Sequence, residues 1–246
     1  MRKSGLWNQL GGLALQVRTG FFAGASQSAP GMSASETERV TKVLDEAYSP
    51  ERLRSVSLRV LSKELDEKRV PELNKWFAEP LGQRISRLEE EAAADSGDPR
   101  QQLSLGNEIL QTMAQPRRAA IQDLVKASRA AETVAEMTIE TTVAAAEGVA
   151  SATPNAPRMS TDDLRRALHA QRPQLLVSLS AMSAAGFARM YNSLSTEDIK
   201  RYVRFLRSAA GRHFNDVGAK AIGAAFKEGA AELGRRLPGT KDKANA

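Results

Sequence analysis

The chain has 246 residues, enough for one large domain or two small ones, and its 41% hydrophobic and 26% charged residues are ordinary for a soluble globular protein. It contains no cysteine and only two histidines, which excludes disulfides and thiol nucleophiles and argues against a metal site, so we expect neither metal nor cofactor. The net charge is +6, but acidic and basic residues alternate along most of the chain, so we interpret them as solvated helix faces and expect no nucleic acid binding.

The N-terminus resembles a signal peptide only in part. Arg2 and Lys3 precede an apolar stretch, but that stretch is interrupted by polar residues and is far shorter than the ~20 residues of a transmembrane helix. Its apolar residues recur instead at helical spacing: Leu6, Leu10, Leu13, Val17 and Phe21. We therefore predict an amphipathic helix from Ser4 to Gly24, no transmembrane segment, and a signal peptide already removed from this sequence.

Two more helices are predicted before residue 65. A loop over 25–35, rich in small residues, leads into a helix with the apolar stripe Val40, Val43, Leu44 and Ala47. Ser49 and Pro50 then form a helix start, with serine as the N-cap and proline at the first helical position. The helix that they open carries an apolar stripe of its own: Leu53, Val56, Val60 and Leu61.

Residues 65–85 and 194–214 repeat one helical pattern without a gap, at the spacing that separates Gly82 from Gly211. Apolar residues match apolar residues throughout: Leu65 with Leu194, Val70 with Ile199, Leu73 with Tyr202, Trp76 with Phe205, Phe77 with Leu206 and Ile85 with Phe214. Repetition of this kind predicts duplicated units that share a buried face.

Each copy contains a corner at which one helix ends and the next begins. Pro80 opens the second helix of the first copy through its fixed φ, and Ser208 opens the equivalent helix by capping it. Gly82 and Gly211 follow in the two copies. Because glycine has no side chain, another backbone segment can approach closely at these positions. This corner is the clearest structural motif in the sequence.

The helix before each corner has a predicted N-cap, Asp66 in the first copy and Ser195 in the second. Pro71 deletes one helical hydrogen bond, so we expect the first of these helices to start late or to bend.

Between the copies, a breaker at residues 95–99 precedes two helices that have no counterpart in the first unit, the second of them starting at Pro116. Later in the chain, Ser160 caps a predicted short helix, and a separate, longer helix is predicted from Pro173 to Asn192. Almost every segment keeps the 3.6-residue period, and no segment predicts a strand.

We therefore predict an all-α protein in which two tandem helical repeats pack as a pseudo-two-fold helical bundle, joined by two connector helices. The predicted units are residues 1–96 and 128–236, with the connector over 97–127 and a flexible tail over 237–246. We expect the units to pack face to face, because each alone has a thin, alanine-rich core.

At its corners the sequence resembles the exported helical bacterial proteins of domain of unknown function 2059. Their recognisable stretch is an acidic helix start, an aromatic pair, and Ser-Pro-x-Gly at the start of the next helix. The first copy matches it with Trp76, Phe77, Pro80 and Gly82, with Glu79 in place of the serine, and the second with Phe205, Ser208 and Gly211, with Ala209 in place of the proline. The resemblance implies an all-helical periplasmic protein, and it implies no reaction.

The acidic run Glu89, Glu90 and Glu91 is the first candidate for a catalytic or metal-binding site. Consecutive residues on a helix point in different directions, and no histidine stands three or four residues away to complete a metal pair. We interpret the run as a solvated helix face.

The histidines and serines also give no catalytic pattern. His213 occupies the position of Arg84 in the first copy and is predicted to lie on a polar rim, while His169 has basic neighbours and no acid to orient it. No nucleophile motif or phosphate-binding glycine loop occurs. We predict no enzyme; the alternative is a hydrolase assembled from scattered Glu and His.

The aromatic residues are most simply core, but some of them are candidates for a groove between the units: Trp7, Phe22, Trp76, Tyr202 and Phe205. The expected function is a periplasmic, non-enzymatic binding or interaction module. Its partner would be an envelope protein, a peptide or an apolar small molecule, and a homodimer is compatible with the sequence. A further alternative is a binder of anionic surfaces, membrane or nucleic acid, which requires Lys and Arg to converge on one face.

Overall fold

The computed structural model describes residues 1–14, 17, 33–152 and 159–237, and within these ranges it contains helices and no strand, which confirms the predicted all-α class. A helical segment over residues 6–14 comes first. The elements that follow are α2 (Ala34–Ala47), α3 (Pro50–Glu64), the 3₁₀ helix η1 (Glu67–Arg69), α4 (Val70–Ala78), α5 (Pro80–Ala94), α6 (Pro99–Thr112), α7 (Gln115–Ser128), α8 (Ala130–Ala152), α9 (Thr161–Met190), α10 (Thr196–Arg207) and α11 (Ala209–Arg236).

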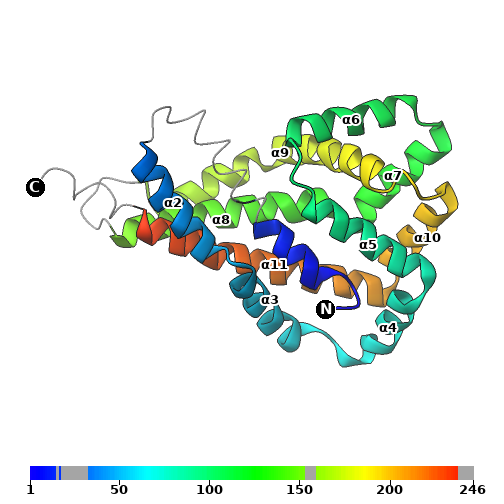
Figure 1. Cartoon of the computed structure of the whole chain (residues 1–246), viewed down its shortest axis with the longest axis horizontal. Helices are drawn as coiled ribbons and strands as arrows, with labels where there is room; N and C mark the ends of the chain where they lie inside the picture. Colours follow the sequence, from blue (N-terminus) through cyan, green and yellow to red (C-terminus); the bar gives the residue numbers. More distant parts are fainter. Residues whose placement is uncertain (15–16, 18–32, 153–158, 238–246) are drawn as a thin grey trace, which may run out of the picture.

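The helices α8 and α11 pack against each other at the centre of the bundle (Figure 1). They approach closely because small residues meet at their crossing: a side chain on Gly148 or Gly234 would run into the backbone of the opposite helix. Helices α2 and α3 pack on α11, α9 packs on α8, and α6 covers α9. Helices α7 and α10 pair at one end of the molecule.

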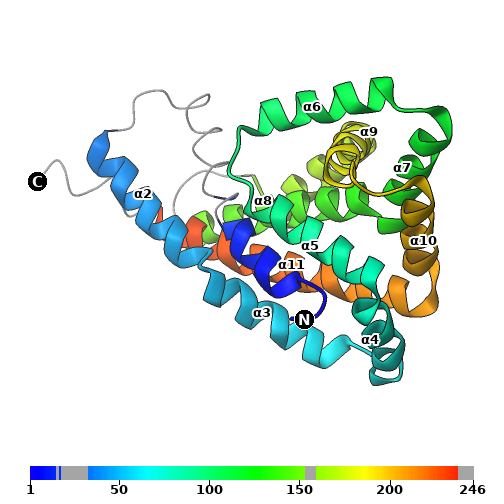
Figure 2. The ribbon, with the colours of Figure 1, turned by 45° about the vertical axis from the view of Figure 1, so that its right-hand side comes forward.

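The segment 6–14 and α5 lie along the same side of α11 in both Figure 1 and Figure 2. They cross closely, because a Cβ atom on Gly12 would collide with the backbone carbonyl of Ala93. Residues 15, 16 and 18–24 of the helix predicted over residues 4–24, including Phe22, and most of the predicted tail lie outside the described residues.

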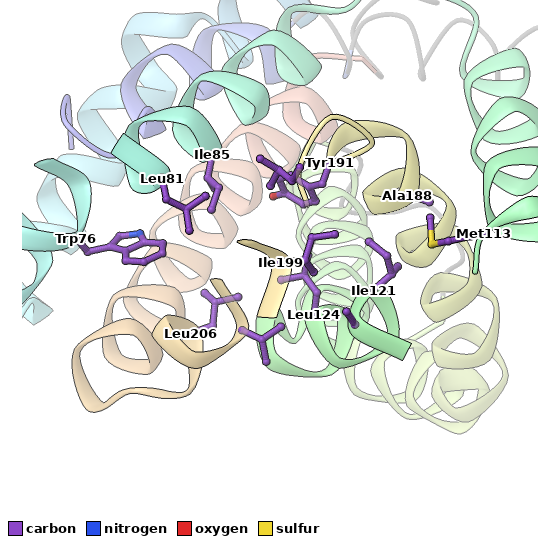
Figure 3. Packing of buried hydrophobic residues seen from close by; sticks show 13 residues of the cluster. Trp76, Leu81, Ile85, Met113, Ile121, Leu124, Ala188, Tyr191, Ile199 and Leu206 are labelled. Atoms are coloured by element: carbon purple, nitrogen blue, oxygen red, sulfur yellow. The ribbon is translucent and has the colours of Figure 1, made fainter. Parts of the chain in front are cut away.

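Two apolar clusters form the described core. One lies where segment 6–14, α2 and α3 meet α11, and includes Leu10, Leu44 and Leu53. The other lies at the opposite end of the bundle and draws side chains from α4, α5, α7, α9 and α10. Figure 3 shows this second cluster, with Ile85 of α5 directed into the same interior as Tyr191.

The helix starts predicted from capping residues are confirmed. The side chains of Ser49, Ser195 and Ser208 each accept a hydrogen bond from the backbone N–H group three residues on, and Pro80 opens α5. Asp66 caps η1, and α4 begins only at Val70, which agrees with the late start expected from Pro71.

The prediction of two helices between Ser160 and Asn192 is wrong. Ser160 does cap a helix, but α9 continues through Pro173 to Met190. Because proline has no N–H group, one carbonyl group in the preceding turn lacks its helical hydrogen bond. Pro173 is exposed, so water can donate a hydrogen bond to that carbonyl group instead. Packing of α9 against both α6 and α8 holds the helix together across this point.

The two corners have the same geometry. A Cβ atom on Gly82 would lie 2.1 Å from the carbonyl oxygen of Trp76, and one on Gly211 would lie 2.0 Å from that of Phe205. In both corners, therefore, the second helix starts directly against the last turn of the first, which only glycine permits.

Residues that are equivalent in the two copies also meet each other. The rings of Trp76 and Phe205 stack with centroids 4.3 Å apart. Arg84 donates to the carbonyl oxygen of Ser193 before α10, while His213, the equivalent of Arg84, accepts from the N–H of Asp66 before α4. The tandem repeat and its two-fold packing stay predictions, which these reciprocal contacts support.

Arg117 of α7 holds the turn between α9 and α10. Its guanidinium group donates to the carbonyl oxygens of Leu194, Tyr191 and Asn192 at 2.6, 3.0 and 3.0 Å. We expect Arg117→Ala to lower the free energy of unfolding by about 2 kcal/mol, since three carbonyl groups lose a charged donor. Arg117→Lys should recover less than half of that loss, because an ammonium group cannot span the three acceptors. Urea unfolding of the three proteins measures both differences, and full recovery by lysine would contradict the role of the planar fork.

Candidate functional site

A cavity of about 490 Å³ lies between segment 6–14, α4, α5, α8, α10 and α11. Most of its wall is apolar, including Leu6, Ile85, Leu206 and Ile222. Gly218 of α11 also lines it, and a Cβ atom at this position would meet no other atom within 4 Å. The helices therefore leave room for a molecule beside α11.

Seven aromatic rings on the cavity wall contact one another in an unbroken series, which we call the aromatic wall. In order along the series they are Phe214, Phe77, Phe205, Trp76, Tyr202, Tyr191 and Phe187, and neighbouring centroids lie 4.3 to 6.1 Å apart. They come from α4, α10, α11 and the end of α9, so the fold assembles one surface from distant parts of the chain. Aromatic pairs at these distances stabilise one another and fix the shape of the wall.

The carboxylate of Glu89 projects from α5 into this cavity, where three donors surround it. The hydroxyl groups of Tyr191 and Tyr202 donate to Oε1 at 2.7 and 2.8 Å, and the side-chain amide of Gln9 donates to Oε2 at 3.2 Å. The three donors come from segment 6–14, α10 and the residue that ends α9. This polar cluster therefore joins residues that are at least 80 positions apart in sequence.

The surroundings of Glu89 disfavour its charged form. Burial raises the pKa of the carboxyl above its ordinary value of 4.5, although the hydrogen bonds from Tyr191, Tyr202 and Gln9 act in the opposite direction. Burial, followed by the charge of Glu89, raises the pKa of both tyrosine hydroxyls well above 10. The tyrosines therefore remain protonated donors at neutral pH.

In the described part of the chain, no basic side chain compensates Glu89. Of the described residues that line the cavity, none is lysine, arginine or histidine, and Glu89 is the only charged one. The groups that shift its pKa likewise include no cation. A buried carboxylate without a cation is costly for a folded protein, so its presence in a cavity marks a candidate functional site.

The prediction that the run at residues 89–91 is a solvated face is wrong for Glu89. Glu91 is exposed and Glu89 and Glu90 are both half-buried, but Glu89 follows Leu81 and Ile85 at four-residue spacing, so its side chain lies on the inner face of α5, where it lines the cavity. That spacing is a sequence signal that could have singled out Glu89. Its hydrogen-bonding partners carry no such signal, because they lie far away in the sequence.

Three of the predicted groove residues, Trp76, Tyr202 and Phe205, line the cavity and belong to the aromatic wall. Trp7 does not line it. The guanidinium groups of Arg2 and Arg54 lie 5.5 and 4.8 Å from the centre of its ring, so its contacts are with surface cations. Phe22 lies outside the described residues.

A second hollow, of about 920 Å³, lies beside α8 and α11 and is lined mainly by charged residues, including His213. Most of its charges pair with one another: Lys220 with Glu64, Lys227 with Glu140, Arg129 with Asp216 and Arg172 with Glu136. Because these ion pairs satisfy the charges mutually, the hollow offers less to a ligand than the cavity does.

Other kinds of site find little support in the described part of the chain. Its His, Asp and Glu side chains nowhere gather in a group of three that could hold a metal ion. His213 accepts from the backbone of Asp66 at 2.9 Å, and His169 is exposed. Among the helices that the structure describes, none combines the length and apolarity needed to cross a bilayer.

The fold and the cavity define a helical bundle with an aromatic, acid-containing interior site. Comparison of the chain with models of known protein families, with curated protein sequences and with solved structures yields no match.

Proposed function

We propose that this protein is a non-enzymatic binding protein that holds a small, mainly apolar molecule in the cavity beside Glu89. The observation that carries the proposal is the cavity itself, whose volume of about 490 Å³ falls within the ~300 to 1,000 Å³ usual for small-molecule sites. Its composition also fits, because such sites are mostly aromatic and aliphatic with a few convergent polar groups.

A binding role agrees better with the contacts of the titratable groups than the hydrolase alternative does. That alternative needs a histidine oriented by a carboxylate, whereas His213 bonds a backbone N–H group and His169 faces solvent. Glu89 is surrounded by donors that hold it in place, and none of the described residues that line the cavity is a histidine or lysine that could act with it as a base.

The resemblance to domain of unknown function 2059 at the two corners supports an exported, periplasmic location, which we include in the proposal. The resemblance rests on Trp76, Phe77, Pro80 and Gly82 at the first corner and on Phe205, Ser208 and Gly211 at the second. Trp76, Phe77 and Phe205 belong to the aromatic wall, and the two glycines allow the close approach of the helices that carry it.

The neutral fluorescent probe N-phenyl-1-naphthylamine tests the cavity directly. We expect its emission to rise on binding to the protein, and Gly218→Leu to weaken binding by at least about tenfold, because the leucine would project into the cavity. Gly223→Leu is the matched control: Gly223 is on the same helix, a Cβ there also meets no atom within 4 Å, and it lines the charged hollow instead.

Native mass spectrometry of protein purified gently from a bacterial host gives an independent measurement. Extra mass that is lost on denaturation, and is absent from Gly218→Leu, would identify a bound molecule. No emission change with the probe, or equal binding by the two leucine variants, would contradict a ligand in this cavity.

A further inference from the structure

Among its described residues, the wall of the cavity carries one acidic side chain and no basic one. Glu89 is the only charged residue among the described residues that line it, and its three hydrogen-bonding partners are neutral. Neutral donors satisfy the oxygen atoms of a carboxylate, but they leave its charge uncompensated in a medium of low dielectric constant. A bound cation would stabilise the ionised form of this carboxyl group.

The oxygen atoms of Glu89 still have capacity for another donor. Oε1 accepts from the two tyrosine hydroxyls, while Oε2 has the amide of Gln9 at 3.2 Å as its one donor in the described structure. A carboxylate oxygen accepts two hydrogen bonds, so Oε2 can take a further N–H group from inside the cavity. The carboxylate is therefore directed at the space that a ligand would occupy.

The aromatic wall favours the same kind of ligand. Trp76 and Tyr202 stack almost parallel, at an interplanar angle of 9°, with centroids 6.1 Å apart, and the hydroxyl of Tyr202 bonds Glu89. Faces of aromatic rings attract cations, and the attraction grows where water is excluded. An anionic ligand would instead meet the carboxyl group of Glu89, and none of the described lining residues is basic and could hold it.

We propose that the cavity binds an amphiphilic cation, a molecule whose protonated amino group pairs with Glu89 while its apolar body lies against the aromatic wall. This inference rests on the proposed function, since it names the chemical class of the ligand for the same cavity.

The experiment compares three competitors that share one alkyl chain and differ in the head group: n-octylamine, n-octanol and n-octanoate. Each displaces N-phenyl-1-naphthylamine from the protein at neutral pH. We expect octylamine to compete at least about tenfold more strongly than octanol, because it adds a hydrogen bond between charged groups, and octanoate to compete least.

Two variants distinguish the effect of the Glu89 carboxyl group, inside the cavity, from that of the neighbouring Glu90 carboxylate outside it. In Glu89→Gln the advantage of octylamine over octanol should shrink to within about twofold. In Glu90→Gln, which removes the adjacent carboxylate outside the cavity wall, the advantage should persist. The wild-type series decides the question by itself if a variant fails to fold.

The failures of the two proposals are distinguishable. If the probe binds and octylamine competes no better than octanol, the cationic ligand is excluded while the apolar cavity site stands. The same holds if the advantage survives in Glu89→Gln. If neither probe nor competitor binds, the proposed function fails, and the cationic ligand fails with it.

Discussion

Replacing Gly211 by alanine should lower the free energy of unfolding by about 3 kcal/mol, an unusually large effect for the addition of one methyl group. The new Cβ would lie 2.0 Å from the carbonyl oxygen of Phe205, and the obstacle is backbone, which no change of rotamer can move. The start of α11 would have to separate from the last turn of α10. We expect the equivalent change at the other corner, Gly82→Ala, to have a similar effect, since its Cβ would lie 2.1 Å from the carbonyl oxygen of Trp76.

Gly218→Ala is the matched control on the same helix. Its Cβ meets no atom within 4 Å, so alanine should raise the free energy of unfolding by about 1 kcal/mol through its better helix propensity. Urea unfolding followed by far-UV circular dichroism measures all three variants. The corner geometry would be wrong if Gly211→Ala and Gly218→Ala shifted the unfolding midpoint in the same direction.

Glu89→Gln should make the protein more stable at neutral and higher pH, with a difference from wild type that depends on pH. In the wild type the folded-state pKa of Glu89 is raised by burial above its ordinary value of 4.5. Between these two pKa values the folded protein binds more protons than the unfolded chain, so the free energy of unfolding falls as pH rises through this window and levels off above it. Glutamine keeps the shape of the side chain and removes the charge, so it removes this part of the pH dependence.

The difference in the free energy of unfolding between wild type and Glu89→Gln reports on Glu89 separately from the other carboxyl groups. Hydrogen bonds from the Gly97 backbone and from the Lys227 side chain are the main causes that lower the pKa of Asp95 and of Glu140, but both proteins share these groups, so their contributions cancel. Unfolding curves from about pH 5 to about pH 8 should diverge as pH rises.

Tyr202→Phe tests the cause, because it deletes one donor that lowers the pKa of Glu89. The decline in stability should then extend to higher pH than in the wild type, and it should disappear in the double variant with Glu89→Gln. Parallel curves for wild type and Glu89→Gln across the range would show that Glu89 does not carry an uncompensated charge in the folded protein.

A gain of stability on removal of Glu89 would itself bear on function. A residue that destabilises the folded protein is more readily retained in evolution if it binds a ligand, because the bound ligand supplies the interaction that the residue lacks. The same variant should lose its preference for octylamine, so stability and ligand selectivity should change in opposite directions at this one position.

The sequence by itself determined the local structure of this protein. Serine and proline signals marked where α3, α5, α10 and α11 begin, and the 3.6-residue period marked their buried faces, because capping and amphipathicity are properties of neighbouring residues. It also singled out Gly82 and Gly211 as places of close backbone approach. The prediction of a helix boundary at Pro173 was wrong, because α9 packs on both α6 and α8 and stays continuous at a residue that usually breaks helices.

Only the tertiary structure decided what the buried faces enclose. The four-residue spacing from Ile85 places Glu89 on the inner face of α5, but nothing near it in sequence shows that Gln9, Tyr191 and Tyr202 supply its hydrogen bonds. The cavity likewise depends on how α5, α10 and α11 fit together, since a void is the space that several packed surfaces fail to fill. Contacts between residues 80 or more positions apart follow from the packing of whole helices, which no local pattern in the chain specifies.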